Sequence, residues 1–169
     1  MTRVRTILTG LCCCAVCCIP VLAQNASSND QKFVDMAAQT DMMEAHLGQM
    51  AADQALSQSV KDFAQMLVTD HTSDYQQLEI VAAKAGATIP KGLDATHNKM
   101  IAPFDNLKGA AFDHRFSQAM VSGHEKAVTE YKKQATEASN ADIKAYATQA
   151  LPVLQKHLDD AKNLEKKKE

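Results

Sequence analysis

Cysteine is absent from the sequence after residue 18, although the whole chain contains five cysteines. All five lie within the first 23 residues, a segment that we expect to be cleaved from the mature protein. Disulfide bonds and thiolate metal ligands are therefore excluded from the folded domain.

Glycine and proline are scarce as well, with six and four residues in a chain of 169. Residues 86–108 hold two of each, Gly86, Gly92, Pro90 and Pro103. Because these residues would interrupt any long helix, this segment is predicted to be a crossover connection, with one helical turn at 97–101. No segment shows the pattern that predicts a β-strand.

The chain also lacks an excess of positive charge. Once Arg3 and Arg5 are removed with the N-terminal segment, 16 of the 18 basic residues remain against 20 acidic residues, a net charge near −4. That balance gives no electrostatic footprint for binding nucleic acid. The sequence contains no nucleophile elbow, phosphate-binding loop or dinucleotide fingerprint, so no motif indicates an enzyme class.

The first 23 residues have the pattern of a secretory signal peptide. Arg3 and Arg5 precede an apolar run over residues 7–23, and Val21-Leu22-Ala23 offers small residues before a cleavage point. The mature chain is predicted to begin at Gln24. We expect a periplasmic or otherwise exported protein with no stable membrane span after cleavage. An uncleaved anchor and a lipidated cysteine are the alternatives.

The rest of the chain is long enough for one hydrophobic core, and its apolar residues recur at the helical spacing of three and four. Four helices are predicted, over residues 31–56, 57–85, 109–138 and 142–164. They would form one domain at 31–164, between a flexible leader at 24–30 and a charged tail at 165–169. Pro152 should kink the last helix. Two short hairpins joined by a long crossover predict an all-α, ferritin-like antiparallel four-helix bundle, with its second and third helices parallel.

Each predicted helix carries one metal-capable side chain in the middle of its apolar face: Glu44, His71, His124 and His157. An isolated charge at a core position is costly. The first two lie thirteen residues before and fourteen after Ser57, and the last two lie sixteen before and seventeen after Asn140. The two side chains of each pair are therefore expected at the same height along the bundle axis, to within about 1.5 Å of helix rise. This predicts one polar cluster inside the bundle.

Three imidazoles and one carboxylate suit a transition metal, because neutral imidazole is a common ligand and the carboxylate balances part of the ion's charge. Zinc or copper is preferred for a histidine-rich site, and iron is less suited. Asp74 and Asp160 each follow a histidine by three residues and are predicted to orient the imidazoles as acceptors. The alternatives are a metal-free Glu/His hydrogen-bond network and a proton-sensing core.

Three other histidines are not expected to reach this cluster. His46 lies two positions from Glu44 and points elsewhere, while His97 lies in the crossover and His114 lies off the apolar face. Copper handling could also be suggested by six methionines, Met42, Met43, Met50, Met66, Met100 and Met120. Methionines at helical spacing more often fill gaps in a core, and we interpret these in that way.

The chain resembles a bacterial envelope family called domain of unknown function 4142, which is grouped with ferritin-like bundles. The resemblance covers residues 32–164 and rests on the following segments: Phe33-Val34, Ala37-Ala38, Glu44-Ala-His-Leu47-Gly48-Gln-Met-Ala51, Val60-Lys61-Asp-Phe63-Ala64, Asp70-His71-Thr72, Ile89-Pro90, Phe112-Asp113, Met120-Val121-Ser-Gly-His124 and Leu151-Pro152-Val-Leu154-Gln-Lys-His157-Leu158. It implies a fold and an envelope location, but no activity.

The chain departs from two patterns, that of the iron-oxidising ferritin-like proteins and that of the family it resembles, and these departures limit the kinds of metal site that are expected. Iron-oxidising ferritin-like proteins carry Glu-x-x-His on two helices, whereas Val68 and Leu154 occupy the glutamate positions here. A mononuclear or redox-silent site is therefore favoured over a di-iron oxidase. The family also places an acid before both bundle histidines; Asp70 follows this pattern and Gly123 does not. An oxidase or hydrolase would need an open coordination position and a cleft, so an enzyme is not favoured.

Overall fold

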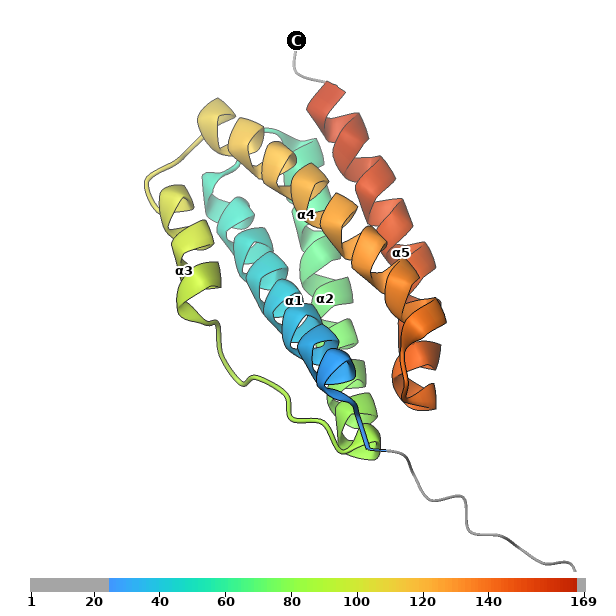
Figure 1. Ribbon diagram of the computed structural model, residues 1–169. Coiled ribbons are helices and arrows are strands. Elements are labelled where there is room, and N and C mark those ends of the chain that lie inside the picture. The colour runs from blue at the N-terminus through green and yellow to red at the C-terminus, as the bar shows by residue number, and fades with distance from the viewer. Residues whose placement is uncertain (1–24, 167–169) are drawn as a thin grey trace, which may run out of the picture.

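The computed structural model describes residues 25–166, which form five α-helices and one short 3₁₀ helix (Figure 1). In chain order the elements are α1 (Ser28–Gln54), α2 (Gln58–Ala85), α3 (Ala95–Ile101), η1 (Ala102–Phe104), α4 (Ala110–Glu137) and α5 (Ala141–Lys166). The predicted signal peptide at 1–23 and the last three residues of the predicted tail lie outside the described part. Within residues 25–166, no helix is long and apolar enough to cross a membrane.

The four long helices pack as two hairpins laid against each other. The chain pairs α1 with α2 and α4 with α5, and the two hairpins meet where α2 packs on α5 and α1 packs on α4. The connection that carries α3 runs along the outside of α1 (Figure 1). Gly109 N donates to Gln54 O at 2.7 Å, so α4 begins beside the end of α1. The crossover predicted at 86–108 is confirmed, with a two-turn helix where one turn was expected.

Local sequence signals explain where the helices begin and end. Ser57 caps α2 and Gly86 ends it in the left-handed conformation at φ 64°, as glycine permits. The start of α1 was predicted too late. Ser27 and Asp30 form a capping box there, so helix begins at Ser28 inside the segment expected to be a leader. Helix α5 continues to Lys166, past its predicted end at residue 164.

Asp30 also ties the two hairpins together. Its carboxylate accepts from the backbone N–H groups of Ser27, Ser139 and Asn140 at 3.0–3.1 Å. These groups belong to the first turn of α1 and to the turn before α5. One buried side chain therefore satisfies donors from both hairpins, which fixes this end of the bundle.

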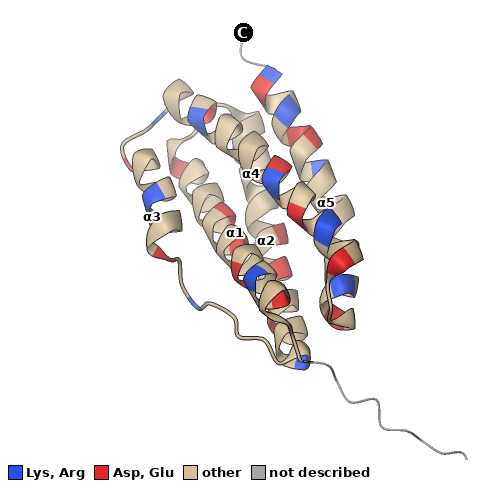
Figure 2. Cartoon of the chain, viewed as in Figure 1, with Lys and Arg blue, Asp and Glu red and all other residues tan. Residues whose placement is uncertain are grey.

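The buried apolar side chains form two clusters. The first includes Phe33, Val34, Leu78, Tyr131 and Tyr146. The second includes Leu47, Leu67, Phe112, Phe116 and Met120. Acidic and basic positions are mixed along the outer faces of α4 and α5 (Figure 2). His71 and His124 fall between the two clusters along α2 and α4, whereas Glu44 lies beside Met43 and Leu47 of the second cluster and His157 beside Leu154 and Leu158 of the first. Buried apolar residues therefore flank all four side chains.

Gly48 sets the closest approach of α1 to α2. A Cβ at this position would lie 2.7 Å from Val68 Cγ2 and 2.8 Å from the Ala64 carbonyl oxygen. Alanine favours the helix by about 1 kcal/mol, but overpacking against a fixed backbone oxygen costs about 1–3 kcal/mol. We expect Gly48→Ala to lower the free energy of unfolding by about 1 kcal/mol or more in urea titrations. Gly92→Ala is the control, because no atom lies within 4 Å of its Cβ position. A stabilised Gly48→Ala variant would contradict this packing.

Candidate metal centre

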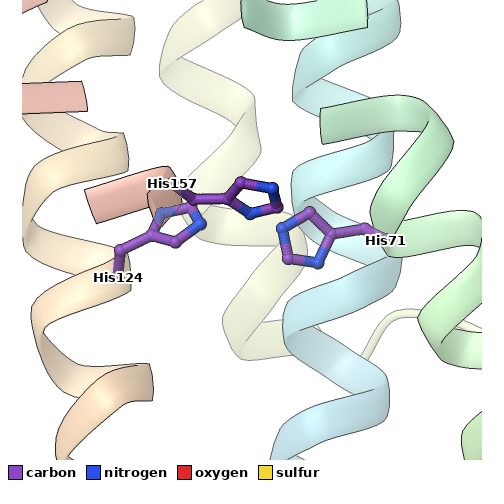
Figure 3. A group of neighbouring side chains, drawn as sticks. All are labelled: His71, His124 and His157. Atoms are coloured by element: carbon purple, nitrogen blue, oxygen red, sulfur yellow. The ribbon is translucent and has the colours of Figure 1, made fainter. Parts of the chain in front are cut away.

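The four side chains that were predicted to meet lie together in the middle of the bundle. Glu44 comes from α1, His71 from α2, His124 from α4 and His157 from α5, and they are 1, 2, 0 and 1% exposed. The imidazoles face one another (Figure 3), with ring centroids 5.3–5.7 Å apart. One nitrogen of each histidine lies within 4.8 Å of the other two, a group that could hold a metal ion.

Four buried atoms of this cluster lack a well-oriented hydrogen bond to any described residue, although the one carboxylate oxygen among them lies within ion-pair distance of two of the nitrogens. They are Nε2 of His71, Nε2 of His124, Nδ1 of His157 and Oε2 of Glu44. Such atoms are rare in proteins, since each unsatisfied buried polar group costs about 1–3 kcal/mol. All four are donor atoms that metals accept. A single coordinated cation would therefore satisfy all of them at once.

The outer nitrogens of His71 and His124 are both held by acceptors. Nδ1 of His71 lies 2.8 Å from Oδ1 of Asp41, and Nδ1 of His124 lies 2.9 Å from the main-chain oxygen of Met120. A carbonyl or an ionised carboxylate can only accept, so Nδ1–H donates in both cases. The lone pair of each neutral imidazole is then on Nε2, which is the atom without a hydrogen bond.

His157 is held in the opposite sense. Its Nε2 donates to Oδ2 of Asp70 at 2.9 Å, which leaves the lone pair on the unpaired Nδ1. An acceptor behind each ring fixes its tautomer and orientation, an arrangement that accompanies almost all metal-binding histidines. When the three rings are neutral, their lone pairs are thus gathered in one place.

Glu44 completes the set of donor atoms. Its Oε2 lies 3.0 Å from Nε2 of His71 and 3.2 Å from Nε2 of His124. Ligand bonds of 2.0–2.1 Å in a tetrahedral zinc site separate the donor atoms by about 3.3 Å. Both distances from Glu44 already approach that value. The imidazole nitrogens, within 4.8 Å of one another, would close around an ion by an approach of about 1.5 Å at most.

The electrostatics of the cluster favour positive charge at its centre. Burial alone would lower the pKa of His71, but the carboxylates of Glu44 and Asp41 raise it to about 10. Burial alone would raise the pKa of Glu44, yet His124 and His71 hold it below its ordinary value. Burial raises the pKa of Asp41 to about 7, despite its bond to His71. A proton and a metal ion would therefore compete for the same place beside Glu44.

At His157, unlike at His71, burial outweighs the nearby carboxylate in its effect on the pKa. It lowers the pKa of that imidazole, and the neighbouring His71 and His124 lower it further when charged, although Asp70 opposes the shift. A lowered pKa keeps His157 neutral near pH 7. Neutral imidazole is the form that binds metals, so this ring is available as a ligand without losing a proton.

The prediction that Asp74 and Asp160 orient the imidazoles is wrong. Oδ2 of Asp74 accepts from the hydroxyl of Tyr146 at 2.7 Å, and Asp160 pairs with Lys156 at the surface. Asp41 and Asp70 hold imidazole nitrogens instead. Spacing along the histidine's own helix was the wrong criterion, because both acceptors reach across to a histidine on another helix.

A sequence signal for both acceptors does exist. Asp41 precedes Glu44 by three residues and therefore shares its inward face. Asp70 precedes His71 in the family pattern, but it bonds His157 of α5 rather than its neighbour. Gly123, which departs from that pattern, is also explained. A Cβ there would lie 3.1 Å from Oε1 of Glu44, so glycine leaves room for the carboxylate.

The remaining histidines lie away from the cluster, as predicted. His46 is exposed on α1, His97 pairs with Asp94 at the start of α3, and His114 is exposed near the start of α4. Among the methionines considered, Met120 touches the site through its main-chain carbonyl.

Two solved structures share the fold. A crystal structure of a DUF305 fragment from Deinococcus radiodurans matches with a TM-score of 0.72 and 15% identity, over 84% of this chain and 98% of that one. CopM in its Cu(II)-bound form matches with a TM-score of 0.67 and 16% identity, over 81% of this chain and 95% of that one. Among curated proteins, the sequence has no significant match.

The sequence also matches a family model over residues 20–164, which covers the four long helices except the last two residues of α5. The chain belongs to that family, described as domain of unknown function (DUF4142).

Proposed function

We propose that this member of the DUF4142 family is an exported protein that binds one transition metal ion inside a ferritin-like antiparallel four-helix bundle. The ligands are His71, His124, His157 and Glu44. The observation that carries the proposal is the set of four buried donor atoms without well-oriented hydrogen bonds. Three of these atoms belong to imidazole rings whose other nitrogen donates to a fixed acceptor. The N-terminal charge pattern and apolar run support export.

Zinc and copper are the preferred ions. Imidazole suits both, and a nearly tetrahedral set of three nitrogens and one oxygen is typical of zinc. Copper is supported by a protein of similar fold, CopM, whose structure has been solved in the Cu(II)-bound form. Four protein ligands leave no open coordination position, which favours a storage, carrier or structural role over catalysis.

A metal-free network is the second candidate, and one observation favours it. Glu44 Oε2 is close enough to His71 and His124 to pair with either ring when that ring is protonated. The raised pKa of His71 supports such a state at neutral pH. The bundle core would then be held by a buried ion-pair network with a role in stability or in binding another protein.

Metal analysis separates the two candidates. The full chain is expressed without an affinity tag, recovered from the periplasmic fraction and measured for metal by mass spectrometry. We expect about one zinc or copper per chain, and a mature N-terminus at Gln24. In the His71→Ala/His124→Ala variant the metal content should fall nearly to zero, whereas His46→Ala should retain it. Equal metal content in the double variant and the wild type would refute the site. An N-terminus at Met1 would refute cleavage.

A further inference from the structure

A pocket of about 420 Å³ lies between α2 and α5, beside the metal centre. Ser73, Gln77, Gln149 and Val153 line it and are exposed at the surface. Its other walls include the buried rings of His71 and His157. The pocket therefore leads from the surface of the protein to two of the three imidazoles.

The carboxylates of this pocket belong to α2, and its outer lining holds no basic side chain. Asp70 and Asp74 line the pocket, and no lysine or arginine is found among its described lining residues. Acidic positions are also spaced along α2 (Figure 2). A concave surface lined by one sign of charge concentrates ions of the opposite sign and speeds their association. The pocket would thus favour a cation over an anion.

Asp70 connects the surface to the site. Its side chain is 40% exposed, yet its Oδ2 lies 2.9 Å from Nε2 of the buried His157. Behind it, Nδ1 of His157 and Nε2 of His71 are buried and have no hydrogen bond to a described residue. An ion that reaches Asp70 therefore meets two unpaired ligand atoms next.

We infer that this α2–α5 pocket is the entry site of the metal ion, with Asp70 and Asp74 as its first contacts and His157 as the ring that receives it. The inference rests on the proposed metal centre. To that centre it adds the route of the ion and the carboxylates that set the rate of metal uptake. The ligand is a hydrated divalent cation, which exchanges its water for carboxylate oxygens before it reaches the imidazoles.

Blocking the pocket tests the route. Zinc uptake by metal-free protein is followed by stopped flow against a chromophoric zinc indicator, and release is followed after adding EDTA. Ser73→Trp places a bulky ring at the mouth, while Thr72→Trp is a matched control on an exposed neighbouring position outside the pocket lining. If the ring leaves the route open for about a tenth of the time, uptake and release both slow about tenfold and the equilibrium affinity is unchanged.

The Asp70→Asn variant supplies a second, independent measurement. If Ser73→Trp does not fold, this second measurement alone tests the entry site. Asparagine can still accept the hydrogen bond from His157, but it removes a charge from the mouth. We expect slower uptake, by about three- to tenfold at low salt, and a weaker dependence of uptake on salt concentration. Asp62→Asn, exposed on α2 and outside the pocket, should leave both unchanged.

The failures of the two proposals are distinguishable. If the wild type binds zinc but Ser73→Trp and Thr72→Trp take it up at the same rate, the entry site is refuted and the metal centre stands. Uptake by Asp70→Asn at the wild-type rate and with wild-type salt dependence would also refute the entry site. If the wild type takes up neither zinc nor copper, both proposals fall together.

Discussion

Saturating zinc is expected to raise the melting temperature of metal-free protein by roughly 10 °C. A ligand that binds only the folded state at a concentration 1,000-fold above its Kd stabilises that state by about 4 kcal/mol. For a domain of this size, each kcal/mol corresponds to about 2–4 °C. The effect should be large here because the donor atoms are already gathered, so the ion meets a preorganised site. Differential scanning calorimetry with and without EDTA gives the measurement.

The controls for this result follow from the geometry. His157→Ala should remove most of the zinc-dependent shift, because Nδ1 of His157 is one of the four donor atoms without a hydrogen bond. His46→Ala should preserve the shift, because that ring is exposed on α1. An equal shift in the His157→Ala variant would show that zinc acts elsewhere on the protein. No shift at all in the wild type would favour the metal-free network.

Glu44→Gln is expected to destabilise the metal-free protein by about 3 kcal/mol near pH 7, because it removes the one buried carboxylate that faces two imidazoles. The change keeps the shape of the side chain, so lost packing contributes little. His71 would keep only Asp41 as a buried acceptor, and His124 would lose the carboxylate beside its Nε2. Urea unfolding in EDTA measures the difference. Glu137→Gln, exposed at the end of α4, is the control and should change stability by less than about 0.5 kcal/mol.

The pH dependence of this difference has a definite sign. The pKa of His71 is about 10 in the folded metal-free protein, against an ordinary value of 6.5. A raised pKa contributes stability that is complete below pH 6.5 and is lost as the pH rises to 10. The gap between wild type and Glu44→Gln should therefore shrink from neutral pH towards pH 10. A gap that widens over this range would contradict the ion pair between Glu44 and His71.

Much of the fold could be predicted from local sequence signals, namely helix caps, helix stops and the residues that interrupt helices. Ser57 before α2 and Gly86 after it are a cap and a stop, and the structure uses both. The glycines and prolines of residues 86–108 force a long connection, which the structure also has. The first boundary was missed because Ser27 and Asp30 form a reciprocal cap within a segment of small polar residues. Polarity alone made that segment resemble a leader.

Part of the candidate site could also be predicted from local sequence patterns. Helical spacing places Glu44, His71, His124 and His157 inward, and counting from the turns places them at one level. The acceptors behind the rings were not predictable in this way, because they depend on which helices become neighbours and on side-chain rotamers. Asp70 lies beside His71 in sequence but bonds His157 across the α2–α5 interface. Only the packed structure shows that contact.

The central claim is that one metal ion is bound by three imidazoles and one carboxylate, and a crystal structure of zinc-loaded protein tests it most directly. Anomalous difference maps on either side of the zinc absorption edge would locate the ion. We predict one strong peak between α1, α2, α4 and α5, at about 2.0–2.1 Å from Nε2 of His71, Nε2 of His124, Nδ1 of His157 and Oε2 of Glu44. Strong peaks confined to the protein surface, with none among these four side chains, would contradict it.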